Sequence, residues 1–257
     1  QTGNFSANSN NVPSPVDEAI INKSLDLSAD GTDDWIHVPS NVVDGLDDFS
    51  LAVWFKTSSD KSQQEIFQAL GSSSSDDELE IYLKDDDKVV IKIKDVSQEL
   101  SSNVELTNNN WHHLVVTRAS TEVCLFIDGV EQECGSSVTG VLSVPNANAI
   151  VIGQEQDSFG GNFSTSQNFI GLLDEFKIFS SRISADDIDD IYQNELAGNN
   201  YDASTRDAVQ CDDFCSINSG TLNAVGIKIN GSGSNRQINN TTEALTIYNA
   251  WLAAGSP

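Results

Sequence analysis

Basic side chains are scarce in this sequence. Thirteen Lys and Arg residues stand against 39 Asp and Glu residues, so the formal net charge is −26. Proteins that bind phosphate backbones or anionic membrane surfaces need clustered cations, so this balance argues against nucleic acid and against an anionic membrane as partners. Long apolar runs are also lacking: no stretch of about 18 apolar residues occurs, and nothing is predicted to span a bilayer. An excess of acids favours solubility and attracts cations.

Motifs of common catalytic sites are lacking too. The sequence contains no nucleophile elbow, phosphate-binding loop or Ser/His/Asp arrangement. The acidic pair Glu78 and Glu80 invites comparison with the two carboxylates of glycosidases, but the alternating pattern predicts a solvent-facing side of a strand. His112 and His113 are neighbours in a strand-like run and therefore point to opposite faces, which predicts packing roles. We predict that the domain is not an enzyme.

The four cysteines form two close pairs. Cys124 and Cys134 flank the turn signal Asp128-Gly129, which places them across a hairpin, slightly out of register, with a bulge or a longer loop. Cys211 and Cys215 are four positions apart, close enough for a local bond. Two local disulfides are predicted, and they imply an oxidising compartment, with the protein secreted or at the cell surface. A zinc site is the alternative use of these cysteines.

Short runs rich in β-branched and aromatic residues, separated by polar turns, predict a β domain. Residues 1–15 are rich in Asn, Ser and Pro and are predicted to form a flexible lead. One strand is expected within Val16–Leu27. The apolar run Phe49–Thr57 predicts a strand that is buried on both faces.

A short helix is predicted near residues 184–197. Ser184 is a favourable N-cap, Ile183 and Ile188 are placed for a hydrophobic staple, and Gly198 is a suitable stop. Residues 199–257 are predicted to form a small C-terminal extension with a loop between the last two cysteines and a terminal helix. No function is predicted for this extension.

The stretch from Gln154 to Gln167 gathers potential metal ligands. Glu155 and Asp157 are two positions apart, so in an extended segment both carboxylates leave the backbone on one side. The side chain of Gln156 points the other way, but its backbone carbonyl can join the carboxylates. A Gly160-Gly161 bend brings Gln167 alongside. Calcium takes about six to eight oxygen ligands, so the stretch predicts a Ca²⁺ site in a loop at one end of a sheet. A polar, solvated loop is the alternative.

The segment IVIGQEQDSFGGNF, residues 150–163, followed by Ser166 and Gln167, resembles the calcium loop of the pentraxins. The wider segment from about Ser24 to Gly198 resembles a laminin-G-like, concanavalin-A-type jelly roll. The runs that carry this second resemblance are Phe49–Phe55, Trp111–Arg118, Leu125–Val130 and Gly171–Phe179. It implies an all-β domain, residues 16–198, with two antiparallel sheets packed face to face, and ligand binding rather than catalysis.

The pentraxin resemblance also implies a ligand set. A neighbouring loop supplies an Asp-Asn pair to calcium in that family, and the aligned residues here are Gln63 and Gln64, with Asp60 close by. A second-site Glu of the family is Ser164 here. These departures predict one calcium ion rather than two, bound more weakly because fewer carboxylates are present.

We therefore expect a calcium-dependent, extracellular recognition domain that binds a carbohydrate or an anionic phosphorylated ligand. The alternative is a structural or adhesive module of a larger bacterial surface or pilus assembly, contacting other proteins of that assembly, whose loop holds a purely structural metal or none.

Overall fold

The computed structural model describes residues 14–21, 23–27 and 34–204, together with the backbone of short strand pairs farther along the chain. Contacts divide the chain into two units, residues 1–205 and 206–257. The second unit contains the antiparallel pairs β16 (Ser216–Ile217) with β17 (Gly220–Thr221) and β18 (Ile229–Asn230) with β19 (Gln237–Ile238). Cys211, Cys215 and the predicted terminal helix lie outside the described residues.

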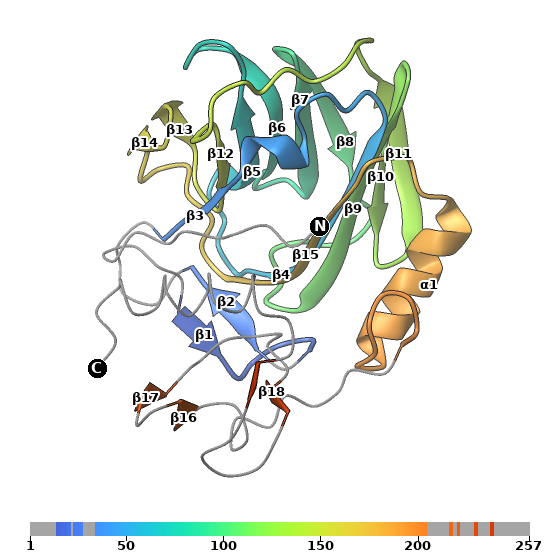
Figure 1. Ribbon diagram of the computed structural model, residues 1–257. Helices are drawn as coiled ribbons and strands as arrows, with labels where there is room; N and C mark the ends of the chain where they lie inside the picture. The colour runs from blue at the N-terminus through green and yellow to red at the C-terminus, as the bar shows by residue number, and fades with distance from the viewer. Residues whose placement is uncertain are drawn as a thin grey trace. The chain divides into compact units, whose positions relative to one another are not determined.

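Two large antiparallel sheets form the first unit (Figure 1). Sheet A has seven strands in the order β1 (Ser14–Val16), β2 (Ser24–Asp26), β15 (Leu172–Phe179), β4 (Phe49–Lys56), β9 (Trp111–Ala119), β10 (Glu122–Ile127) and β11 (Val130–Ser136). Sheet B has six strands in the order β3 (Ile36–Val38), β12 (Ile150–Ile152), β5 (Gln64–Leu70), β6 (Asp77–Leu83), β7 (Lys88–Ile93) and β8 (Val96–Ser101). A 3-10 turn, η1 (Ser40–Val42), follows β3.

The core lies between the two sheets. Alternate side chains of each sheet enter it, among them Leu79, Ile81 and Leu83 of β6 and Val89, Ile91 and Ile93 of β7. The residues between them in these strands, including Glu80, Tyr82 and Lys92, therefore face away from the core. The predicted jelly-roll sandwich is confirmed.

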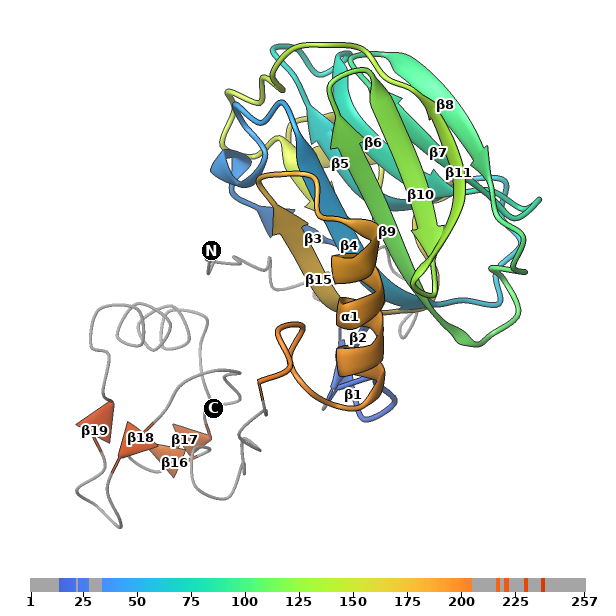
Figure 2. The same ribbon diagram turned by 90° about the vertical axis from the view of Figure 1, so that its right-hand side faces the viewer.

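Strand β4 is buried on both faces, as predicted. Leu51, Val53 and Phe55 enter the core between the sheets. Ala52 and Trp54 face the other way, toward helix α1 (Ala185–Leu196), which lies along the outer side of sheet A (Figure 2).

Helix α1 begins and ends where the sequence predicts. The Ser184 side chain accepts a hydrogen bond from the Asp187 backbone N–H, and Asp187 accepts one from the Ser184 backbone N–H, which completes a capping box. Gly198 adopts a positive φ of 80° just past the end. Among the described helices, none is long and apolar enough to cross a membrane.

The strand expected within Val16–Leu27 is β2. It pairs with β1, which begins at Ser14 inside the predicted flexible lead and so corrects the end of that lead, and the chain reverses between residues 17 and 23. Asp174 of β15 accepts the backbone N–H groups of Ile20 and Ile21, both at 3.0 Å, and so holds the turn.

Candidate metal centre

The acidic loop between β12 and β15 folds back on itself as a small hairpin, β13 (Gln156–Ser158) with β14 (Gly161–Phe163) (Figure 1). The bend needs Gly160, which has a φ of +66°, and a Cβ there would lie 2.6 Å from Cε1 of His37. The backbone N–H of Gly160 donates to Gln156 Oε1 at 2.8 Å. The loop is therefore built around a glycine bend, as the sequence predicted.

Gln156 directs its side chain inward, so it anchors the loop. It is 1% exposed, and its amide donates to the backbone carbonyl of Ala149 at 2.7 Å. Its backbone N–H donates to Gln68 Oε1 of β5, also at 2.7 Å. These bonds fix the loop against sheet B, and the neighbouring residues Glu155 and Asp157 are fixed with it.

Glu155 is mostly buried, with 9% of its surface exposed, whereas Asp157 is exposed. Burial and, after it, the nearby charges of Asp157, Glu80 and Asp77 together raise the pKa of Glu155 to about 7, against a hydrogen bond to Gln68 that lowers it. Acids placed so close together repel one another. The ionised state of Glu155 thus needs a compensating positive charge.

Asp77, at the start of β6, lies beside this loop although it was not among the predicted ligands. Gln68 bridges it to the loop: Nε2 of Gln68 donates to Asp77 Oδ1 at 3.1 Å while Oε1 accepts from Gln156. The available signal was the acidic pair Asp76-Asp77, which stands immediately before an alternating strand. Only the pairing of β5 with β6 brings it beside Glu155.

Gln167 closes the loop from the far end. Its amide donates to Gln63 Oε1 at 3.0 Å, and its backbone carbonyl accepts the N–H of Glu65 at 2.9 Å. Gln63 in turn donates to Glu65 Oε2 and Glu80 Oε1, both at 3.2 Å. A continuous set of polar contacts therefore runs from Gln167 to the acids of sheet B.

Gln64 and Asp60 are placed differently from the other predicted ligands. Gln63 and Glu65 share one face of the chain, so Gln64 between them points to the other. Its amide donates to the carbonyl of Ser59 at 2.8 Å and accepts from the hydroxyl of Thr57 at 3.2 Å. Asp60 is exposed on the loop before β5. Of the two aligned glutamines, Gln63 is the one that contacts Gln167.

The cluster offers oxygen donors, but in the described part of the chain only Glu122, Cys124 and Cys134 bring three His, Cys or carboxylate ligand atoms within 4.8 Å of one another. Within the described part of the chain, Glu155 Oε2 and Glu65 Oε1 are buried and have no hydrogen-bond partner. Unpartnered buried carboxylate oxygens are costly unless a cation or a proton satisfies them. Burial, with the charge of Glu80, raises the pKa of Glu65 well above its usual range. The donors are carboxylate and amide oxygens, which hard cations such as Ca²⁺ prefer.

The pair Glu78 and Glu80 is buried rather than solvent-facing, which corrects the expectation from the pattern. Glu78 Oε1 accepts the backbone N–H of Ser143 at 2.7 Å, and Glu80 Oε2 lies 2.9 Å from Lys92 Nζ. The connections that cross sheet B cover this face, and a strand pattern alone does not contain that information.

The adjacent histidines point in opposite directions, as predicted. Nδ1 of His112 lies 2.9 Å from Asp128 Oδ2, and Nε2 of the same ring lies 3.1 Å from Asn108 Oδ1. His113 stacks near Trp54 and Tyr192 beneath α1, and burial lowers its pKa to about 3. Both have packing or hydrogen-bonding roles.

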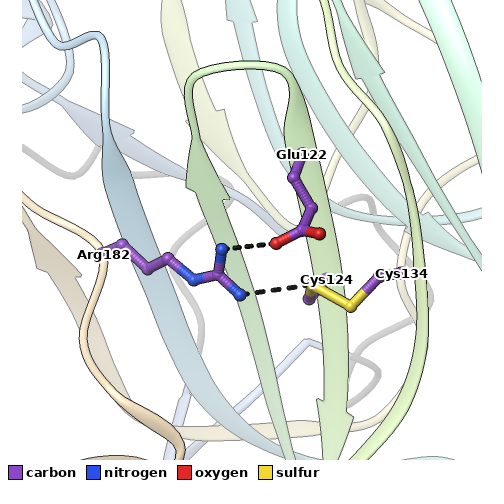
Figure 3. Close-up of a disulfide and its surroundings, with 4 residues drawn as sticks. All are labelled: Glu122, Cys124, Cys134 and Arg182. Carbon is purple, nitrogen blue, oxygen red and sulfur yellow. Dashed lines mark hydrogen bonds and ion pairs between the residues drawn. A yellow bond between two sulfur atoms is a disulfide. The ribbon is translucent and has the colours of Figure 1, made fainter.

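Cys124 and Cys134 form the predicted disulfide, joining β10 to β11 (Figure 3). They are direct cross-strand partners, and a register shift after Leu125 supplies the predicted bulge. Arg182 lies beside the bond, with Nη1 2.5 Å from Glu122 Oε2 and Nη2 3.5 Å from Cys124 Sγ. Glu122 and the two sulfur atoms lie close together, but the sulfurs are bonded to each other, which rules out the zinc alternative for this pair.

The model of the concanavalin A-like lectin/glucanases superfamily matches residues 30–189. The chain belongs to this superfamily. Within it, the chain is similar to pentraxins: it is 26% identical over 149 residues to C-reactive protein 1.4 of Limulus polyphemus, a match covering 56% of this chain and 60% of that protein. It is 29% identical over 85 residues to human neuronal pentraxin-2, covering 32% of this chain and 20% of that protein. The chain thus spans less than two-thirds of these relatives.

Solved structures of the superfamily show the same fold at low identity. A native heptameric SAP-like pentraxin of Limulus polyphemus aligns with a TM-score of 0.52 and 17% identity over 62% of this chain and 75% of its own. Domain 4 of AbnA, an extracellular arabinanase of Geobacillus stearothermophilus solved with arabinotriose, aligns with a TM-score of 0.54 and 20% identity. The alignment covers 73% of this chain and 86% of that chain. Botulinum neurotoxin type C, whose cell entry depends on two ganglioside molecules, aligns with a TM-score of 0.53 and 17% identity. The alignment covers 75% of this chain and 46% of that chain. These similarities show the fold of the domain.

Proposed function

We propose that this domain recognises a carbohydrate through a calcium ion held at the edge of sheet B. The ligands of the ion are the carboxylates of Glu155, Asp157 and Asp77, the backbone carbonyl of Gln156 and the amide oxygen of Gln167. One observation carries the proposal: Glu155 is buried among Asp77, Glu80 and Asp157 with an unpartnered oxygen. A bound divalent cation would relieve the repulsion among these acids.

The ion would supply a positive centre that two neighbouring hydroxyl oxygens of a sugar can approach. A neutral sugar is favoured over a phosphorylated ligand, because the net charge of −26 and the acids around the loop repel anions. The arabinotriose of the AbnA domain is a neutral carbohydrate bound by a protein that shares the fold. The Cys124–Cys134 bond supports a secreted or surface location.

Calcium binding is tested by thermal unfolding in a chelator and in millimolar CaCl₂. A ligand at about 100 times its Kd stabilises a protein by about 2.7 kcal/mol, so the melting temperature should rise by several degrees. The variant Glu155→Gln/Asp157→Asn should lose this rise. The control Asp189→Asn/Asp190→Asn removes the same formal charge from exposed positions on α1 and should keep it. An unchanged melting temperature in the wild-type protein would contradict the proposal.

Carbohydrate recognition is tested separately, on an array of arabino-oligosaccharides and ganglioside glycans with and without chelator. Retention that disappears with the chelator and with the double loop variant supports the proposed mechanism. Retention that survives both removes calcium from recognition.

A structural module is the second candidate. The amide of Gln167 already donates a hydrogen bond to Gln63, and the hydrogen bond from the Gln156 amide to the carbonyl of Ala149 holds the loop without a metal. Calcium stabilisation with no glycan retained in either condition would favour this candidate.

A further inference from the structure

Lys92 of β7 reaches directly into the acidic site. Its Nζ atom lies 2.6 Å from Asp77 Oδ2 and 2.9 Å from Glu80 Oε2. The register of sheet B explains the contact, because Lys92 is the cross-strand partner of Glu80 and shares its outward face. The ammonium group is three-quarters buried, with 25% of the side chain exposed.

The two acids that Lys92 contacts, Asp77 and Glu80, also influence the acidic loop between β12 and β15. Asp77 is bridged to the loop through Gln68, and the charges of Asp77 and Glu80 both raise the pKa of Glu155. Burial lowers the pKa of Lys92, but hydrogen bonds to Asp77 and Glu80 outweigh burial and raise it above its usual range. The side chain therefore stays charged at physiological pH and supplies one positive charge to the cluster.

We propose that Lys92 is a tethered cation that holds the acid cluster together without metal and competes with calcium for Asp77. The inference rests on the proposed calcium site. The hydrogen bond from Lys92 occupies one oxygen of Asp77, and its charge repels a divalent ion nearby. Calcium would have to displace Lys92 from Asp77, while Glu80 retains the ammonium group. Lys92 thus sets the calcium concentration at which the site fills.

Removing the charge of Lys92 should lower the stability of the metal-free protein and raise its affinity for calcium. Without metal, removing the charge of Lys92 increases the repulsion among Asp77, Glu80 and Glu155, so the metal-free protein should melt several degrees lower. With metal, the same change removes both the competitor and its repulsion. The variant should therefore bind calcium about tenfold more tightly, an order-of-magnitude figure for one unit charge a few ångströms from the ion in a partly screened site.

The experiment compares the wild-type protein with Lys92→Gln, Lys92→Arg and Lys88→Gln by calorimetric titration with CaCl₂ and by unfolding in chelator. Lys88 is on the same strand and pairs with Asp86 and Glu99, away from the loop, so Lys88→Gln is the matched control. We expect tighter calcium binding and lower metal-free stability for Lys92→Gln alone. Lys92→Arg keeps the charge and should stay near the wild type. A cooperative unfolding transition verifies that each variant is folded.

The outcomes separate this inference from the proposed function. Wild-type binding with unchanged or weaker binding by Lys92→Gln overturns the inference and leaves the calcium site standing. Binding by Lys92→Gln but not by the wild type supports the inference and shows that the lysine keeps the natural site closed, which overturns the proposed function. No calcium binding by any variant overturns both.

Discussion

Sheet A and sheet B each bury acids on their outer face, but the partners of these acids differ. Under helix α1, Glu195 is fully buried and accepts a hydrogen bond from Trp54 Nε1 at 2.8 Å, and its other oxygen lies 2.5 Å from Lys177 Nζ. On sheet B, Glu65, Glu80 and Glu155 are buried with Asp77 nearby, and the ammonium group of Lys92 pairs with Asp77 and Glu80.

The difference separates a structural acid from a ligand-binding one. A buried carboxylate with a cation and a hydrogen-bond donor stabilises the contact that it makes, and its removal leaves a buried charge behind. A group of acids with unpartnered oxygens is unfavourable by itself and gains from a further cation. Helix α1 therefore uses its acid to attach to sheet A, and sheet B has the arrangement expected of a binding site.

Glu195→Ala should have the largest effect on stability. The change leaves buried Trp54 without its hydrogen-bond acceptor and removes one of the two acids that Lys177 contacts, the other being Glu175. The free energy of unfolding should therefore fall by about 3 kcal/mol, measured by urea denaturation. Calcium affinity should not change, because the residue lies on the other sheet. A loss below about 1 kcal/mol would remove the distinction between the two faces, since a paired acid would then matter no more than a surface one.

Removing the disulfide changes the same outer face of sheet A, the one that helix α1 covers. Cys124 packs with Ala52, Val115, Phe126 and Ile188 beneath the helix, and the bond closes a hairpin loop. Replacing both cysteines by serine should lower the free energy of unfolding by about 2–3 kcal/mol, the value for a short closed loop. Calcium affinity should again be unaffected. A large loss of calcium binding would mean that the two sheets are coupled and would weaken the comparison.

The pH dependence of metal-free stability tests sheet B. The folded-state pKa of Glu155, about 7, lies above its usual 4.5, so the folded protein binds more protons than the unfolded chain between these values. Stability in chelator should therefore fall as pH rises from 4.5 to 7, by on the order of 1–2 kcal/mol from this residue. Glu155→Gln should reduce the slope, and calcium should reverse the loss at neutral pH. A Glu155→Gln slope equal to that of the wild type would show that Glu155 is not the repelled acid.

Asp60→Asn should have the smallest effect. Asp60 is exposed and lies in the loop that holds Gln64, away from the contacts of Gln63. We expect a change in unfolding free energy within about 0.5 kcal/mol and calcium affinity within about twofold of the wild type. A tenfold loss of affinity would restore Asp60 to the ligand set and move the site toward that loop.

Much of the fold could be predicted from local patterns. The buried strand β4, the capped helix α1 and the hairpin disulfide each depend on residues close together in sequence, and each was confirmed. The strand expected within Val16–Leu27 is β2, but its pairing with β1 was not predicted, because the turn between them is held by Asp174, a residue far along the chain.

The candidate site was predictable only in part, for the same reason. The loop with Glu155, Asp157 and the glycine bend is one continuous segment. Asp77, Glu80 and Lys92 come from two other strands, and nothing in their local pattern distinguishes them from a solvated polar face.

The sequence by itself determined the acidic character of the chain, the identity of its glycine-bend loop and the local elements that frame the sandwich. Tertiary structure alone decided which acids share one low-dielectric site and that a lysine lies among them. The physical reason is that the burial and repulsion of a carboxylate depend on strands brought together by pairing register, over separations that a linear pattern does not encode.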